Sequence, residues 1–453
     1  MPSLAKNLNT KFALASLVGL LAVLISSGLV SQEKKPTEKK PVETDAADKD
    51  YAEELPRIPP TEAKDAVKTF TIANGFQMDL VAAEPLVTDP IALAIDENLR
   101  MYVVEMGGYS ENRDEKLSRI RLLEDKDGDG HYETSKIFTD KLNWPTAIAC
   151  WDGGIIVADA PDILWFKDTN GDDVPDERKV LFTGFGLSNV QGLINSFNWG
   201  LDNRYYCSTS STGAEATKPS DPSFKPLPLR GRDFALDCRT MLLEPTTGGA
   251  QHGLTFDDWG NRFICHNSDH IIQVMIEDRY LARNPYLAAA TPKKSIAVDG
   301  PQADVFRTSR VEPWRVVRTR LRKKGIVPGI VEGGGRDSGY FTSATGVTIY
   351  RGNAWPKEFH GLAIVGDVGS NIIHRKRLEE NGLEFKAVRI DEKSELVAST
   401  DNWFRPVQYA NGPDGSLLVC DMYRETIEHP ASLPPAIKKY VDLTSGRDRG
   451  RIW

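Results

Sequence analysis

Six stretches of the chain share one pattern of apolar and polar positions. Each begins with a short apolar run, passes through a turn rich in Asp, Asn and Gly, and ends with a second apolar run that stops at a polar residue. Short runs bounded by such turns predict β-hairpins rather than helices. The six stretches are residues 89–105, 144–159, 190–208, 251–266, 345–367 and 405–421.

A second repeat places these hairpins in a larger unit. The stretch around Asp125 matches the stretch around Asp168 over most of its length, which gives a period of 43 residues. Periods of this size are typical of propeller blades and helical arrays, and the short β-type flanks favour blades. The sequence therefore predicts an all-β fold for residues 61–453, a six-bladed β-propeller in which each hairpin is the inner half of a blade.

The two aligned stretches carry Asp-rich loops that resemble the first half of an EF-hand calcium loop. The twelfth position, a bidentate Glu in an EF-hand, is Lys136 here. Alternating carboxylates around a glycine can still surround one hard cation, so we predict structural calcium (Ca2+) in these blade turns. The alternative is a solvated turn that Asp and Asn stabilise. The predicted ligands are Asp125, Asp127, Asp129 and Glu133 in the first loop, and Asp168, Asn170, Asp172 and Asp176 in the second.

The ends of the six hairpins form the candidate site. In an antiparallel hairpin the start of the first strand and the end of the second lie at the same end. Six hairpins around an axis therefore place two rings of side chains on one face. The strand-start ring consists of Asp89, Trp144, Gln191, His252, Thr345 and Arg405. The strand-end ring consists of Glu105, Asp159, Ser208, His266, Asp367 and Asp421.

His252 and Arg405 are the predicted catalytic residues of these rings. A neutral histidine at a central mouth can act as a general base, and an arginine can hold a carboxylate or a developing oxyanion. Arg405 is also predicted to bind a cofactor, together with Trp144, Gln191 and His266. The alternative is that these polar ends satisfy one another around a water-filled tunnel.

Two long insertions separate some of the hairpins, between Cys207 and His252 and between His266 and Thr345. They are rich in Pro, Gly and charged residues, and we expect them to form loops that cover one face. The basic run of residues 318–324 in the second insertion is expected to be an exposed loop.

The N-terminal sixty residues have a different composition. Lys6 and Lys11 precede an uncharged apolar run at residues 12–30, which is typical of an export signal. The run is also near the length that spans a bilayer, so residues 1–31 are predicted to be a signal peptide or a membrane anchor. Residues 32–60 are predicted to be a disordered linker. In both cases we expect an exported protein, periplasmic or anchored at the cell surface.

Composition and cysteine usage narrow the function further. The net charge of −8 argues against a partner nucleic acid. The five cysteines form no CxxC or CxxCH motif, so nothing indicates a structural zinc site or a covalent haem. Cys207, Cys265 and Cys420 each precede a strand-end residue, and we expect them to be packing residues.

Three of the quoted regions resemble a known family. "QHGLTFDDWGNRFICHNSDH", "GPDGSLLVCDMYRETIEHP" and "TSGRDRGRIW" are similar to the membrane-bound dehydrogenase domain common in planctomycete and verrucomicrobial proteins. That domain is similar in turn to soluble quinoprotein glucose and sorbosone dehydrogenase propellers. The resemblance covers about residues 70–453. It implies calcium and pyrroloquinoline quinone (PQQ) as cofactors, with His252 taking the hydroxyl proton of a substrate and Arg405 holding a quinone carboxylate.

The resemblance also implies partners. The substrate would be a sugar or another alcohol. Several relatives continue into a cytochrome c module with CxxCH, which this chain lacks. Either the chain is a truncated product, or its electrons would leave to a separate cytochrome or quinone acceptor. We therefore expect an exported PQQ-dependent dehydrogenase. Two rival functions remain open. One is a calcium-dependent lactonase or esterase that holds its metal with Glu105, Asp159 and Asp421, and the other is a non-enzymatic propeller that binds carbohydrate or protein.

Overall fold

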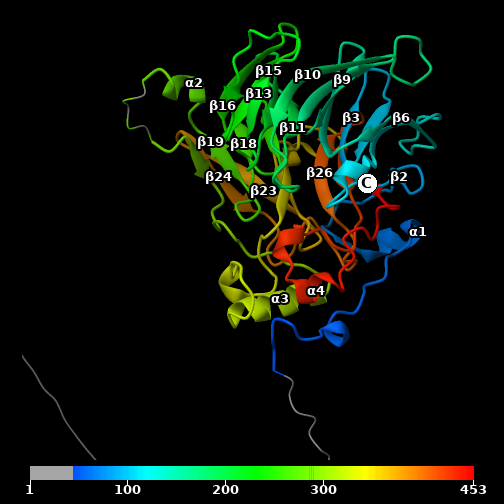
Figure 1. Cartoon of the computed structure of the whole chain (residues 1–453), viewed down its shortest axis with the longest axis vertical. Helices are drawn as coiled ribbons and strands as arrows, with labels where there is room; N and C mark the ends of the chain where they lie inside the picture. The colour runs from blue at the N-terminus through cyan, green and yellow to red at the C-terminus, as the bar shows by residue number, and fades with distance from the viewer. Residues whose placement is uncertain (1–43, 285, 287, 289) are drawn as a thin grey trace, which may run out of the picture. The chain divides into compact units, whose positions relative to one another are not determined.

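The computed structural model describes residues 44–284, 286, 288 and 290–453, and Asp45–Trp453 forms one compact unit. Its strands are arranged in six sheets (Figure 1). The inner strand of each sheet contacts the inner strand of the sheet on either side, and the circle closes between β26 (Pro406–Asn411) and β3 (Pro90–Ile95). The predicted six-bladed, all-β propeller is therefore confirmed.

The first three blades start in chain order, but the last two strands of blade 2 lie between strands of blade 3 in the sequence. Blade 1 contains β3, β4 (Met101–Glu105), β5 (Ser118–Glu124) and β6 (Thr134–Leu142). Blade 2 contains β7 (Pro145–Trp151), β8 (Gly154–Asp159), β9 (Asp162–Lys167), β10 (Glu177–Phe185), β13 (Ala214–Thr217) and β14 (Leu227–Pro228). Blade 3 contains β11 (Asn195–Trp199), β12 (Tyr205–Ser208), β15 (Arg232–Asp237) and β16 (Leu242–Thr247).

The last two blades also take strands from the beginning of the propeller. Blade 4 contains β17 (Leu254–Phe256), β18 (Arg262–Ile264), β19 (Ile272–Val274) and β20 (Lys293–Ser295). Blade 5 contains β21 (Ala344–Ile349), β22 (Ala363–Asp367), β23 (Ile372–Asn381), β24 (Glu384–Arg389), β25 (Val397–Ser399) and β1 (Phe70–Ile72). Blade 6 contains β26, β27 (Leu417–Asp421), β28 (Arg451–Ile452) and β2 (Ala82–Ala83).

All six predicted hairpins are the inner strand pairs of the blades. Their register brings Pro90 opposite Glu105 and Pro406 opposite Asp421, so strand starts and strand ends do lie at one end of the ring. The core fills the spaces between neighbouring blades with apolar side chains. Cys207, Cys265 and Cys420 are buried and unpaired, as expected of packing residues.

The helices of the described residues are short, and α3 is the longest of them. The α-helices are α1 (Ala63–Ala66), α2 (Asp278–Leu281), α3 (Pro313–Lys323) and α4 (Pro435–Lys438). The 3-10 turns are η1 (Ala52–Glu54), η2 (Val67–Thr69), η3 (Arg113–Glu115), η4 (Gly333–Gly335), η5 (Lys357–Phe359) and η6 (Pro430–Ser432).

α3 shows that the basic run of residues 318–324 is not the exposed loop expected from its charge. Pro313 occupies the first turn, where its missing N–H costs no hydrogen bond. Trp314, Val317 and Leu321 recur at helical spacing and are buried on one face. Three basic residues in the last turn complement the negative end of the helix dipole.

The predicted C-terminal boundary of the linker of residues 32–60 is too late in the chain, because the segment from Asp45 onward already packs against the rest of the protein. Tyr51 and Leu55 are buried in the apolar cluster that α3 forms with α4. Asp45 pairs with Arg320 at 3.0 Å, and Glu54 pairs with the same guanidinium at 2.6 Å. These apolar and ionic contacts order the segment from Asp45 onward.

No helix in the described part of the chain is long and apolar enough to cross a bilayer. The apolar run of residues 12–30 lies outside the described residues. Its function as a signal peptide or anchor stays a prediction.

Candidate functional site

A cavity of about 390 Å³ lies at the end of the propeller axis where the inner strands begin. We call it the axial cavity. Every blade contributes residues to its wall, near the start of its inner strand. These residues include Ile91, Thr146, Asn195, Gly253, Gly346 and Val407. Ligand sites usually have volumes of about 300–1,000 Å³, so the axial cavity can hold a small organic molecule.

A second cavity of about 270 Å³ lies farther along the same inner strands. Gly253, Gly346 and Gln408 line both cavities, so the two spaces meet at these residues. Gly253 has a φ of 122°, and a Cβ there would lie 2.6 Å from the backbone nitrogen of Val347. Glycine at this position therefore lets two inner strands approach closely around the axis.

His252 and Gln191 are the members of the predicted rings that line the axial cavity. Burial lowers the pKa of His252 to about 4, and the main chain of Gln191 opposes this shift only in part. The imidazole is therefore neutral at pH 7, with one ring nitrogen able to accept a proton. The side-chain amide of Gln191 donates to the Tyr109 hydroxyl at 2.9 Å.

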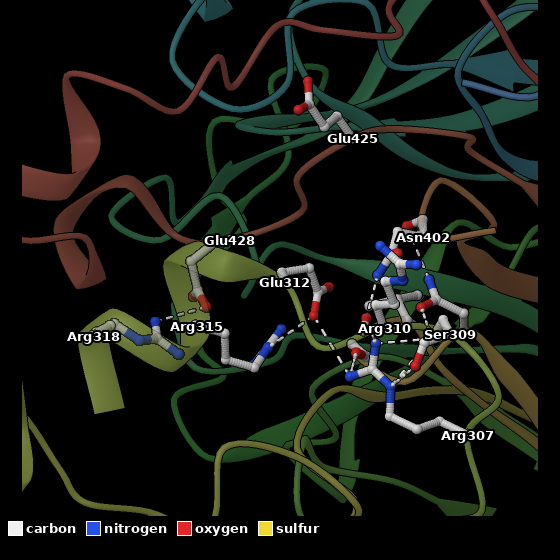
Figure 2. Close-up of polar contacts among 12 residues, drawn as sticks. Arg307, Ser309, Arg310, Glu312, Arg315, Arg318, Asn402, Glu425 and Glu428 are labelled. Carbon is white, nitrogen blue, oxygen red and sulfur yellow. Dashed lines mark hydrogen bonds and ion pairs between the residues drawn. The ribbon is translucent and has the colours of Figure 1, made fainter. Parts of the chain in front are cut away.

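α3 and the segment of residues 427–432 form another part of the cavity wall, which we call the arginine wall. Arg318 and Arg322 of α3 line the cavity together with Glu428 and Ser432. Figure 2 shows Arg318 beside Glu428, and its Nη1 lies 2.8 Å from a carboxylate oxygen. Among the described residues, the buried Nε atoms of Arg318 and Arg322 have no hydrogen-bond partner.

The sequence reasoning missed Arg318 and Arg322, because it treated their run as a solvated loop. The available signal was the apolar spacing of Trp314, Val317 and Leu321 after Pro313, which predicts a helix with one buried face. The many basic residues of this run led to the prediction of an exposed loop instead.

Arg405 does not reach the axial cavity and cannot be the predicted clamp. It is 1% exposed, and carbonyl groups and one carboxylate surround its guanidinium. It donates to the carbonyls of Val368 at 2.6 Å, Arg424 at 3.0 Å and Glu425 at 2.6 Å. Its Nη1 also lies 3.2 Å from Glu312, so every face of the group is occupied by the protein itself.

Glu312, just before α3, is the centre of a buried ionic cluster (Figure 2). Its carboxylate lies 3.2 Å from Arg405, 3.4 Å from Arg315 and 3.5 Å from Arg307. Burial raises the pKa of this carboxyl, but the three guanidiniums outweigh burial and lower the pKa to about 2. The cluster joins the start of α3 to blades 5 and 6.

The carboxylates of the strand-end ring accept hydrogen bonds from the backbone and do not line the axial cavity. All four accept a hydrogen bond from the backbone N–H of a residue just before the inner strand of the same blade. The pairs are Thr88 with Glu105 at 2.7 Å, Asn143 with Asp159 at 2.9 Å, Thr342 with Asp367 at 2.9 Å, and Arg405 with Asp421 at 2.7 Å. None of these acids is among the described residues that line the cavity.

The remaining ring members also lie away from the cavity. Trp144 is 8% exposed, and its Nε1 donates to the Gly108 carbonyl at 3.0 Å. Burial lowers the pKa of His266, and Lys293 lowers it further. Asp89 forms a buried ion pair with Arg424. Trp144 and His266 are therefore not placed to bind a ligand in the axial cavity.

The two Asp-rich loops connect the outer strands of adjacent blades, β5–β6 and β9–β10. In the first loop, oxygens of Asp125, Asp127, Asp129 and Glu133 lie within 4.8 Å of one another. In the second loop, Asp176 accepts hydrogen bonds from Thr169 and Asn170. Among the described residues, only the first loop gathers such a set of acidic groups.

The structure thus defines a class of protein, a six-bladed β-propeller with a ligand-sized cavity at one end of its axis. Residues 62–453 match the model of a domain of unknown function (DUF7133), and the chain belongs to that family. No curated protein matches the chain.

Several solved structures are similar to this chain. The PQQ-bound aldose sugar dehydrogenase of Streptomyces coelicolor is 14% identical, with a TM-score of 0.43 over 84% of this chain and 97% of that chain. The holo PQQ domain of Coprinopsis cinerea pyranose dehydrogenase is 14% identical, with a TM-score of 0.43 over 88% and 98%. A Trichoderma reesei carbohydrate-active enzyme of family AA12 is 13% identical, with a TM-score of 0.46 over 78% and 95%.

Proposed function

We propose that this chain is an exported dehydrogenase that oxidises a sugar or another alcohol in the axial cavity, with a quinone as cofactor. The observation that carries the proposal is a neutral His252 on the wall of a 390 Å³ cavity that also holds two arginine side chains. A proton acceptor and fixed cations at one concave site suit the removal of a proton and the binding of an acidic cofactor. The resemblance of the hairpin sequences to quinoprotein propellers supports the same class.

The wall residues fit a carboxylate-bearing quinone such as PQQ. Arg318 and Arg322 offer guanidinium groups whose Nε atoms lack partners within the described chain. Gln191 and Gln408 add side-chain amides to the same wall. These residues would hold the cofactor. When bound, such a quinone supplies a two-electron acceptor for the hydride of a carbinol carbon.

His252 would act as the general base in this proposal. Its unprotonated ring nitrogen would accept the hydroxyl proton of the alcohol. The hydrogen on the carbinol carbon would leave with the bonding electron pair, as hydride. The low pKa keeps this nitrogen free of a proton at neutral pH. The proton then passes to solvent, and the electrons pass to a separate cytochrome or quinone acceptor.

Reconstitution tests this function. The purified chain, loaded with PQQ and calcium, is expected to give dye-linked oxidation of sugars, and His252→Ala is expected to slow it by about 10²–10⁴-fold. A quinone that binds without any oxidation of sugars or other alcohols would contradict the proposal.

A calcium-dependent lactonase or esterase finds no support in the positions of the acids. That function needs Glu105, Asp159 and Asp421 to hold a metal at the axial mouth. Each instead accepts a backbone N–H, and Glu105 also pairs with Arg119 and Arg121. Hydrolysis of lactones with calcium alone would restore this alternative.

Calcium is proposed as a structural ion of the first Asp-rich loop. The support is the set of four carboxylate side chains within 4.8 Å of one another between β5 and β6. Hard cations such as calcium prefer several carboxylate oxygens in a flexible arrangement.

A further inference from the structure

Two arginines of α3 are tied to the same residue beside the axial cavity. Arg318 donates to the Ser432 hydroxyl at 2.9 Å, and Arg322 donates to the Ser432 carbonyl at 2.9 Å. Arg318 also pairs with Glu428 at 2.8 Å. These contacts hold Nη1 of Arg318 and Nη2 of Arg322, so the side chains are held in place before any ligand arrives.

The same guanidiniums are incompletely satisfied. Arg318 is 5% exposed, and within the described chain its Nε has no partner; the Nε of Arg322 is also buried and without a partner. A buried N–H without an acceptor costs about 1–3 kcal/mol, more when the group is charged. A ligand that supplies an acceptor would remove this cost.

The acids nearby do not fill these positions. Glu428 already accepts hydrogen bonds from Arg318 and from the His429 backbone at 2.9 Å. Glu332 also lines the cavity and, among the described residues, forms no hydrogen bond or ion pair with either arginine. Glu312 is engaged by three other guanidiniums.

We propose that Arg318 and Arg322 form a binding site for a carboxylate group of a small ligand in the axial cavity. Guanidinium and carboxylate are both planar, and their hydrogen bonds are charge-assisted and often paired. Two sources share this chemistry, the quinone cofactor and an acidic sugar substrate such as a uronate. The inference deepens the proposed function and rests on it only in placing the ligand in this cavity.

Binding measurements test the site without any turnover. Isothermal titration of the full chain uses D-glucuronate, D-glucose as its uncharged counterpart, and PQQ. Arg318→Lys and Arg322→Lys keep the positive charge near Glu428 and Ser432 but remove the planar guanidinium. We expect each variant to bind the carboxylate ligand at least about tenfold more weakly, as loss of one charge-assisted hydrogen bond requires.

A matched control lies on the same helix. Arg320→Lys changes an arginine that pairs with Asp45 and Glu54 and does not line the cavity. It is expected to leave both affinities unchanged, and thermal melting of all three variants checks that they are folded.

The two sources give different patterns. If PQQ-loaded protein prefers glucuronate to glucose and the variants lose that preference, the site takes the substrate carboxylate. If glucuronate shows no preference and the variants bind PQQ more weakly, the site takes the cofactor. Unchanged affinity of the folded variants for both carboxylates overturns the inference. Failure of the proposed function would look different, as bound ligands without oxidation.

Discussion

His252 is suited to a base mainly because it is partly buried in the cavity wall. Since burial lowers its pKa to about 4, the ring nitrogen stays deprotonated throughout the neutral range. We therefore predict that kcat/KM decreases through protonation of this group only around pH 4 and below, and not near pH 6.5. A pH profile of sugar oxidation measures this limb.

The control for this prediction is His266→Ala, which changes a histidine outside the cavity. This variant is expected to show the same pH profile of sugar oxidation as the wild-type protein. His252→Ala is expected to lower kcat by about 10²–10⁴-fold. A limb near pH 6.5 that persists in His252→Ala would show that another group is the base.

A second buried histidine governs acid stability rather than chemistry. His270 is fully buried against Phe341, with ring centroids 4.1 Å apart. Neither ring nitrogen has a hydrogen-bond partner within the described chain, and Nε2 lies 3.9 Å from an Asp299 oxygen. Burial lowers its pKa well below the ordinary value, and neighbouring charges add to this. The other ionisable groups around it are Asp299, His374, Lys376 and Arg389.

This burial predicts the sign of the pH dependence. Below about pH 6.5 the unfolded chain binds a proton at His270 that the folded chain does not, so the free energy of unfolding falls as pH decreases. His270→Phe keeps an aromatic ring beside Phe341 and removes the titrating group. Urea unfolding between pH 7 and pH 5 is expected to show a smaller loss of stability in this variant. An identical slope in both proteins would refute the prediction.

At this scale the sequence predicted only part of the site. It located His252 and Gln191 at the mouth, because the ends of hairpins can be read from apolar runs and turns. It could not tell that Arg405 points away from the cavity, because Arg405 precedes β26 and a register irregularity between Pro406 and Gln408 breaks the regular alternation of sides. Val407 and Gln408, two and three positions later, line the cavity instead.

The element that decides the shape of the cavity wall is α3, and Glu312 holds its first turn in place. Removing that charge in Glu312→Gln leaves Arg307, Arg315 and Arg405 with an uncompensated buried charge. Breaking a buried ion pair on one side costs about 3–5 kcal/mol, so we predict a loss of this order in the free energy of unfolding. Chemical unfolding with urea measures it.

Glu425→Gln is the matched control, because its partner Arg57 is half exposed. It is expected to cost about 1 kcal/mol or less, as surface pairs do. Equal losses in the two variants would mean that Glu312 has no special role in fixing α3.

The loop between β5 and β6 gives a second prediction at the scale of elements. If calcium fills it, a chelator is expected to lower the melting temperature, because an ion that binds only the folded state stabilises it by mass action. Asp127→Asn removes one charged ligand and is expected to weaken calcium binding in a titration. Asp140→Asn, an exposed acid on β6 outside the loop, serves as the control. A melting temperature that does not change when the chelator is added would rule out a structural ion.

The whole molecule was easier to predict than its site, because six similar hairpins at regular intervals leave few architectures other than a ring. What the hairpins do not encode is how the ring closes. β2 and β28 are each two residues long, too short to be recognised from sequence, yet they complete blade 6. α3 and the ordered segment from Asp45 onward fall in regions whose charge and proline content suggested loops.

Ring closure depends on the last residues of the described chain. β28 pairs with β27 on one side and with β2 on the other, so Arg451 and Ile452 connect strands from opposite ends of the propeller. Trp453 adds an indole N–H bond to Asp421 at 3.0 Å and an edge contact with Phe70 at 4.9 Å. We predict that deleting these three residues costs more than the about 3–5 kcal/mol of a single buried tryptophan-to-alanine change.

Urea unfolding measures this loss, and binding of a cavity ligand reports on the geometry of the ring. Trp453→Phe should be milder, since it keeps the apolar contact with Phe70 and gives up only the bond to Asp421. Leu383→Ala, at the exposed turn between β23 and β24, is expected to be neutral because Leu383 is 93% exposed. If the deletion unfolded at the same urea concentration as Leu383→Ala, the three residues would contribute nothing to closure, and the side chains that converge on the axial cavity would be held by the inner strands alone.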